Sequence, residues 1–127
     1  MSSNLFNQSS ANPTTKSLLE RRGEFYRIQA KYPDRIPIII IPSESNIQIK
    51  KTKYLVCHDF TISQLLYVIR SHSTDKASNS AYFVFHRNMM LPSYRTMGEI
   101  FNSEQELKNE NDDGFVYLHL SRETTFG

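Results

Sequence analysis

The chain has 127 residues, which is the usual length of one domain. Hydrophobic residues make up 39% of it, enough to build a core and to exclude a wholly disordered protein. The net charge of +2 is too small to indicate nucleic-acid binding, and a single cysteine excludes an intramolecular disulfide. No apolar run approaches the roughly 20 residues of a membrane-spanning helix, and residues 1–17 lack the apolar stretch of a secretory signal.

The N-terminal third of the chain predicts a tail followed by a helix. Residues 1–13 are polar, rich in serine and asparagine, and without periodicity, so we expect a flexible tail. Asn12-Pro13 is typical of a helix start. Apolar side chains then recur at helical spacing through residues 18–32, which predicts one helix, or two short helices divided at Gly23. Proline disfavours helical backbone in the residue before it, so the helix should end before Pro33.

Two strands are expected next. Residues 35–41 form a β-branched run that is apolar on both faces, which favours a strand inside a sheet. Pro37 is tolerated in such a strand only near its beginning or at an edge. After a turn, residues 47–50 and 54–56 are expected to form a second strand, which makes a hairpin with the first.

Two capping boxes mark the starts of later helices. Thr61 and Gln64 form the first, and an apolar stripe within residues 62–69 gives that helix one buried face. Thr96 and Glu99 form the second, which opens a short helix.

The remaining strands suggest the topology. Residues 82–86 have an aromatic strand pattern, and residues 115–120 are apolar on both faces, which favours a central place in the sheet. From residue 35 the expected order is ββ-α-β-α-β. A hairpin, a helix packed across the sheet and a late central strand predict an α+β fold of the β-grasp type, as in ubiquitin. We place the domain at residues 14–121 and a tail at residues 122–127.

The sequence offers little catalytic or metal chemistry. The four histidines show no metal-ligand spacing and have no cysteine cluster beside them. Cys57 and His58 are neighbours on an expected strand, so their side chains point to opposite faces and do not form a nucleophile–base pair. We expect Cys57 to be a small buried apolar residue. We therefore predict no enzyme activity, no metal site and no cofactor.

A basic cluster lies on the expected second strand. It consists of Lys50, Lys51 and Lys53, with Arg35 on the first strand. Two interpretations remain open. The lysines guard an exposed strand edge against aggregation, or the edge accepts an extended peptide as an added strand and the lysines select an acidic flank.

The last residues, Thr124-Thr125-Phe126-Gly127, also have two interpretations. One is a frayed terminus that ends in glycine. The other is a conjugation tail whose terminal carboxylate is activated and transferred, because glycine has no Cβ to obstruct the narrow sites of conjugating enzymes.

Five motifs, in order and at nearly family spacing, resemble the ubiquitin-like modifiers of autophagy, the autophagy-related protein 8, light chain 3 and GABARAP family. The motifs are KYPDRIPII at residues 31–39, KYLV at 53–56, YVIR at 67–70, DGFVY at 113–117 and TFG at 125–127. The similarity runs from about Leu19 to Gly127. It implies a ubiquitin-like core with two additional N-terminal helices.

The resemblance also implies a function. Family members are activated at the exposed glycine by an E1-like enzyme, passed to an E2-like enzyme and joined to phosphatidylethanolamine, after a cysteine protease has exposed the glycine. Here the reacting residue would be Gly127. The protein would be a cytoplasmic monomer before conjugation and would lie on autophagosomal membranes when lipidated. There it would bind cargo receptors that carry an aromatic-x-x-aliphatic motif.

The resemblance implies three groups of site residues beside the second strand and one elsewhere. The pocket for the aromatic residue would be lined by Glu24, Ile28, Pro37, Ile39, Lys53, Leu55 and Phe115. The pocket for the aliphatic residue would use Tyr54, Val56, Phe60, Leu65 and Val68. The acidic flank of the motif would meet Arg35, Lys51 and Lys53. The protease and conjugation enzymes would contact Phe83, Phe85 and Phe126.

One departure and three rivals bear on this interpretation. Cys57 replaces the proline that usually follows the KYLV motif. A modifier of the autophagy protein-conjugation branch would usually end in Trp-Gly rather than Phe126-Gly127. An unconjugated peptide-binding module is the second rival. The third is an RNA-binding domain that stacks bases on Tyr82, Phe83 and Phe85, which the small net charge disfavours.

Overall fold

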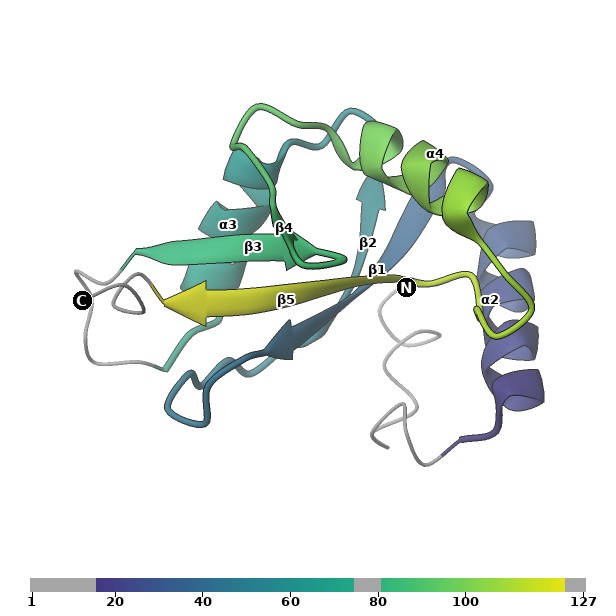
Figure 1. Ribbon diagram of the computed structural model, residues 1–127, viewed down its shortest axis with the longest axis horizontal. Helices are drawn as coiled ribbons and strands as arrows, with labels where there is room; N and C mark the ends of the chain where they lie inside the picture. Colours follow the sequence, from purple (N-terminus) through teal and green to yellow (C-terminus); the bar gives the residue numbers. More distant parts are fainter. Residues whose placement is uncertain (1–15, 75–80, 123–127) are drawn as a thin grey trace.

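A computed structural model describes residues 16–74 and 81–122 (Figure 1). Within these ranges, helices pack on one mixed sheet in an α+β fold. In chain order they are α2 (Leu18–Lys31), β1 (Arg35–Pro42), β2 (Lys53–Cys57), α3 (Ile62–Ser71), β3 (Tyr82–His86), β4 (Met89–Met90), α4 (Met97–Leu107) and β5 (Val116–Arg122).

The sheet has the order β2-β1-β5-β3-β4. Strands β1 and β5 are parallel, and the other neighbours are antiparallel. The last strand therefore lies in the middle of the sheet, as its two apolar faces predicted. Figure 1 shows β5 between β1 and β3, with α2 at the right of the sheet.

Helices cover both faces of β1, which explains its continuous apolar run. Ile36, Ile38 and Ile40 point into the main core with α3 and α4. Ile39 points the other way and packs with Phe115 against α2. The sheet therefore has two apolar layers of unequal size, and the smaller one lies under α2.

Pro37 fits in this inner strand because of its register. The Ile40 amide donates to the Thr52 carbonyl across the β1–β2 boundary, at 2.7 Å. Backbone groups alternate along a strand, so the nitrogen of Pro37 faces the β5 side. The pairing with β5 begins only at Ile38. The missing N–H of proline therefore costs the sheet no hydrogen bond.

Local signals predicted the helices well. Both expected capping boxes are present, at Thr61 with Gln64 and at Thr96 with Glu99. The helix α2 runs unbroken through Gly23 and ends before Pro33. Its cap is Ser17, whose side chain accepts from the Glu20 amide in a third capping box, which the sequence analysis had not identified.

Two expectations were wrong. Residues 47–50 do not belong to the second strand. Instead the Lys50 amide donates to the His72 carbonyl at 2.9 Å, so the segment is held to the end of α3. Cys57 is exposed rather than buried, because it ends an edge strand where no helix covers it. The short strand β4 was not expected.

Two other expectations lie outside the described residues. They are the flexible tail at residues 1–13 and the first of the two additional N-terminal helices that the resemblance implies. A third expectation was wrong, because the helix α2 begins at Leu18 with Ser17 as its cap and not at Asn12-Pro13. The division of the chain into a domain at 14–121 and a tail at 122–127 stays a prediction.

Candidate functional site

The strand β2 lies at one edge of the described sheet, with β1 as its neighbour on one side. The Thr52 carbonyl faces β1, so the backbone groups of Tyr54 and Val56 face β1 as well. Those of Leu55 and Cys57 point away from the sheet. An edge with outward amides and carbonyls is the backbone template that an added peptide strand requires.

The residues expected to line the aromatic pocket lie on the α2 face of this edge. Leu55 points toward α2 and is half-buried against the small core, which contains Ile28, Ile39 and Phe115. Pro37 pairs with Leu55 across the strands and is buried. The residues expected to line the aromatic pocket therefore come together between α2, β1 and β2.

A carboxylate and two amines lie near these residues. Lys16 Nζ and Glu24 Oε1 form an ion pair at 3.1 Å, in which the Glu24 side chain is mostly buried. Burial lowers the pKa of Lys53, the negative charge of Glu24 acts against that effect, and the positive charge of Lys16 adds to it. Lys16 was not among the expected site residues, because it precedes the helix and belongs to no sequence motif.

The residues expected to line the aliphatic pocket lie on the other face of the sheet, beside the same strand. Tyr54, Val56 and Leu65 are buried in the main core beneath α3. Phe60 and Val68 pack against that core and stay partly exposed. Three of the five expected residues are therefore core residues, and the other two present partly exposed apolar surface beside the edge.

The basic residues do not form one cluster. Lys51 lies with its ammonium group 5.3 Å from the centre of the Tyr54 ring, and its carbonyl accepts from the Tyr54 hydroxyl at 3.0 Å. Burial raises the pKa of Tyr54 to about 12, so the hydroxyl stays protonated. Arg35 pairs with Cys57 at the other end of β2, about 13 Å from Lys53 along the strand. The residues expected to meet an acidic flank therefore lie at two ends of β2, with Lys51 and Lys53 at its start and Arg35 beside its end.

The loop before β5 fixes α2 against the sheet. Arg21 Nε donates to Asp113 Oδ2 at 2.9 Å, and Arg22 Nε donates to the Asp112 carbonyl at the same distance. Asp113 also accepts from the amide of Phe115 and from the hydroxyl of Tyr117. The small core under α2 thus depends on contacts made by this loop. The sequence analysis had identified only part of this segment through its DGFVY motif.

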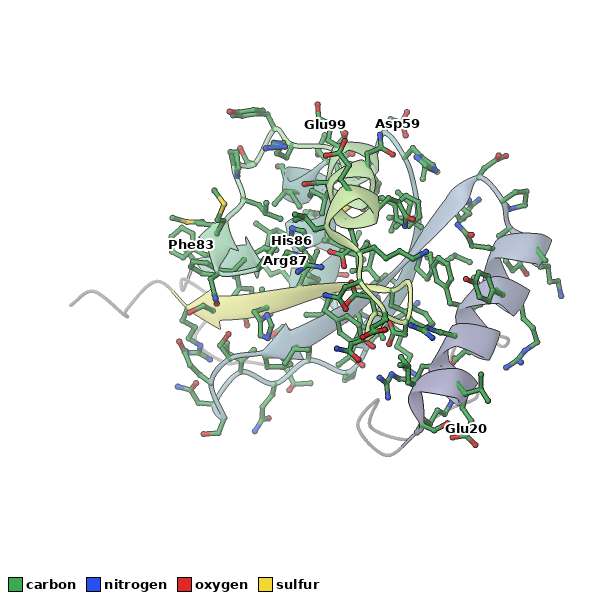
Figure 2. The ribbon with its side chains drawn as sticks, turned by 45° about the vertical axis from the view of Figure 1, so that its right-hand side comes forward. Glu20, Asp59, Phe83, His86, Arg87 and Glu99 are labelled. Carbon is green, nitrogen blue, oxygen red and sulfur yellow. The ribbon has the colours of Figure 1, made fainter. Side chains whose placement is uncertain are left out.

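Phe83 and Phe85 form a separate surface. Both are half-buried on β3, where they pair with Ser121 and His119 of β5. Two strands, β1 and β5, separate β3 from β2. Figure 2 shows Phe83 at the end of the sheet away from α2. Phe126 and Gly127 lie outside the described residues.

Two further features are absent from the described residues. Across residues 16–74 and 81–122, no three or more His, Cys, Asp or Glu side chains gather in a way that would hold a metal ion. No helix in the same ranges is long and apolar enough to cross a membrane.

Comparisons with known proteins agree with this architecture. The family described as "Autophagy protein Atg8 ubiquitin like" matches residues 20–127. Autophagy-related protein 8c of Arabidopsis thaliana is 42% identical over 112 residues, covering 86% of this chain and 89% of its own. Autophagy-related protein 8B of Oryza sativa subsp. indica is 39% identical over 113 residues, covering 87% and 90%.

A solved structure supports the same assignment. The crystal structure of Trypanosoma brucei ATG8 superposes with a TM-score of 0.74 at 31% identity, over 91% of this chain and 96% of that one. The chain therefore belongs to the Atg8 family of ubiquitin-like autophagy proteins, and it is a modifier rather than an enzyme.

Proposed function

We propose that this chain is joined through Gly127 to phosphatidylethanolamine and then recruits cargo receptors to autophagosomal membranes. The receptors would bind by an aromatic-x-x-aliphatic motif that adds a strand to β2. Before conjugation the chain would be cytoplasmic, and it would require a processing cysteine protease and E1-like and E2-like enzymes. Two acyl chains on one lipid give stable membrane anchoring, which one chain does not.

The observation that supports peptide binding is the alternation of β2 between two apolar surfaces. Side chains along an extended peptide point alternately to the two faces of the sheet. Residues i and i+3 therefore point to opposite faces. An aromatic residue directed to the pocket beside Leu55 places an aliphatic residue three positions later on the α3 face, beside Phe60 and Val68.

The charges near the edge support an acidic flank. Lys51 and Lys53 are half-buried at the start of β2, so they keep apolar stems against the strand. A desolvated ammonium such as that of Lys53 gains from an incoming carboxylate, because burial already disfavours its charge. We therefore expect acidic residues next to the aromatic position to strengthen binding.

Conjugation is tested by the mass of the C-terminal peptide from membrane and soluble fractions of cells. A phosphatidylethanolamine adduct on Gly127 in the membrane fraction alone supports the proposal. An isopeptide bond to lysine assigns the chain to the protein-conjugation branch instead. A free carboxylate in every fraction, even under starvation, leaves an unconjugated peptide-binding module. A Gly127→Ala chain that keeps its membrane localisation would also exclude lipid conjugation.

A further inference from the structure

The outer face of α2 carries an apolar line that the described fold leaves exposed. Leu19, Gly23, Tyr26 and Ala30 recur at i, i+4, i+7 and i+11, which places them on one side of the helix. Leu19 is 79% exposed and Tyr26 58%, whereas Ile28 on the opposite side is 1% exposed against the sheet. We call these four residues the α2 stripe. The proposed peptide-binding site beside β2 uses none of them.

Gly23 lies at the centre of the stripe. A Cβ built there would meet, apart from the helix backbone and the chain neighbours, only the side chain of Arg27 on the same helix, with Nη1 at 3.5 Å. The space in front of the backbone thus holds only the end of a flexible side chain. Glycine at this place costs the helix stability, but it permits another helix to approach closely.

Opposite charges flank the stripe on one side. Glu20 and Arg27 are seven residues apart and therefore lie on the same side of α2. Both are exposed, and Figure 2 shows Glu20 in the first turn at the outside of the molecule. Glu20 lies three residues before Gly23 and Arg27 four residues after it. A two-fold axis at Gly23 would place Glu20 of each copy next to Arg27 of the other copy, which gives two such contacts.

We propose that the α2 stripe is a self-association surface through which two copies of this chain pair with antiparallel α2 helices, crossing at Gly23. In such a pair the same sides of both helices meet, so the two Glu20–Arg27 contacts are attractive. Leu19 of each copy packs next to Tyr26 of the other. A parallel pair would bring different sides together and would lose both charge contacts. The interface is isologous, as in most homodimers.

The pair is weak in dilute solution. A helix of 14 residues is about 21 Å long, and its outer face alone buries less than the roughly 1,200 Å² of a stable specific interface. Dilute chains are therefore monomeric. Crowding many copies on one surface raises the effective concentration and favours pairing. The proposal does not depend on the lipid or on peptide binding, since neither involves the stripe.

A disulfide-trapping experiment on the full chain tests the geometry. The background variant is Cys57→Ser, which removes the native thiol. Gly23→Cys in this background should form a disulfide-linked dimer under a mild oxidant, because position 23 meets its own copy at the axis. The matched control is Ala30→Cys, which lies on the same stripe but seven residues from the axis. The two copies of position 30 would be about 21 Å apart, beyond the reach of a disulfide.

Charge exchange tests the partner. In the Gly23→Cys background, Glu20→Lys and Arg27→Glu should each lower the dimer yield by about tenfold, because like charges then face each other twice. A mixture of the two variants should restore the yield as a heterodimer, which is identified by mass. Glu20→Lys also removes a capping contact, whereas Arg27→Glu leaves the cap intact and must lower the yield by itself.

Four results would overturn the proposal. The first is equal cross-linking at positions 23 and 30, which would indicate random collision. The second is a mixture of the Glu20→Lys and Arg27→Glu chains that gives no higher yield of disulfide-linked dimer than either variant alone. The third is a low yield at position 23 combined with weaker binding of Leu19→Ser to phosphatidylserine-containing vesicles, which would assign the stripe to a membrane. The fourth is a dimer yield that rises tenfold on removal of residues 1–15, which would assign the α2 stripe to that segment of the same chain.

Discussion

His86 Nε2 lies 2.7 Å from Glu104 Oε1, and this contact joins the end of β3 to α4 in a buried site. Arg87 adds two hydrogen bonds to the same carboxylate, from Nε at 3.2 Å and from an η nitrogen at 2.8 Å. Arg87 and Asn88 form the turn to β4 with φ values of 51° and 70°. Figure 2 shows His86 and Arg87 side by side. The carboxylate thus fixes the hairpin against α4.

The first prediction concerns the pH dependence of stability. Burial raises the pKa of Glu104, but hydrogen bonds from Arg87 and His86 outweigh burial and hold the pKa below its usual value. A lowered pKa in the folded state stabilises the protein above the unfolded pKa of about 4.3, and this contribution is lost as the pH falls through the folded value. Glu104→Gln should therefore cost about 2–3 kcal/mol at pH 7 and less at pH 3, as measured by urea denaturation.

A matched control for Glu104→Gln is Glu106→Gln, an exposed residue of the same helix. It should change the free energy of unfolding by less than about 0.5 kcal/mol at either pH. If Glu104→Gln costs the same at pH 3 and pH 7, the ionised carboxylate is not the stabilising group.

The second prediction compares two glycines. Gly114 has φ of +101°, and a Cβ there would lie 2.5 Å from the Phe25 ring under α2. Gly114→Ala should therefore lower the free energy of unfolding by about 2–4 kcal/mol, from backbone strain and overpacking. Gly23→Ala should raise it by about 0.5–1 kcal/mol, because that glycine is helical and its Cβ has room. Thermal denaturation of both variants measures the difference. Changes of the same sign would contradict the packing of Phe25.

The third prediction separates the peptide pocket from the core. Leu55→Ala should weaken binding of an aromatic-x-x-aliphatic peptide by about tenfold, since it removes half-buried apolar surface from the expected aromatic pocket. Lys53→Ala should weaken the same peptide mainly when it carries acidic residues, and the effect should shrink at high salt. Isothermal titration calorimetry measures both. Conjugation at Gly127 should stay largely intact.

Leu107→Ala is the control for the third prediction, because Leu107 is a largely exposed leucine on α4, outside the expected pocket. It should leave peptide affinity unchanged. Equal loss of peptide binding and of conjugation in Leu55→Ala would mean that Leu55 supports the fold and that the pocket assignment is wrong.

Local and pattern-based signals predicted most of the fold. Capping boxes depend on residues three positions apart, so Thr61 and Thr96 could be recognised without tertiary information. The central place of β5 followed from its two apolar faces. What the sequence did not reveal depends on distant partners. The Lys50 amide donates to the His72 carbonyl, and Lys16, which precedes α2, forms an ion pair with Glu24.

The error at Cys57 has the same origin. A small apolar residue in a strand is usually buried, and Cys57 continues the strand formed by Tyr54 and Val56. Its exposure follows from its position at the end of an edge strand, which only the order of the sheet determines. The residues expected to line the candidate site were likewise identified from the family resemblance. Hydrophobic periodicity alone does not distinguish residues that line a pocket from residues of the core.

The last prediction concerns this exposed position. The Cys57 amide points away from β1, so Cys57→Pro removes no hydrogen bond of the β1–β2 ladder. Val56 is already extended, as a residue before proline must be. Stability should change by less than about 1 kcal/mol. If an added peptide strand reaches Cys57, its affinity should fall about fivefold, which corresponds to one backbone hydrogen bond of about 1 kcal/mol.

Cys57→Ser distinguishes the backbone from the side chain. It keeps the amide and changes only the thiol, so peptide affinity should equal that of the parent chain. Calorimetric titration of the parent, Cys57→Ser and Cys57→Pro chains with one peptide therefore measures how far along β2 the added strand extends. Equal affinities in all three would place the end of the peptide strand before Cys57, nearer Leu55. A loss in Cys57→Ser would instead assign a direct role to the thiol.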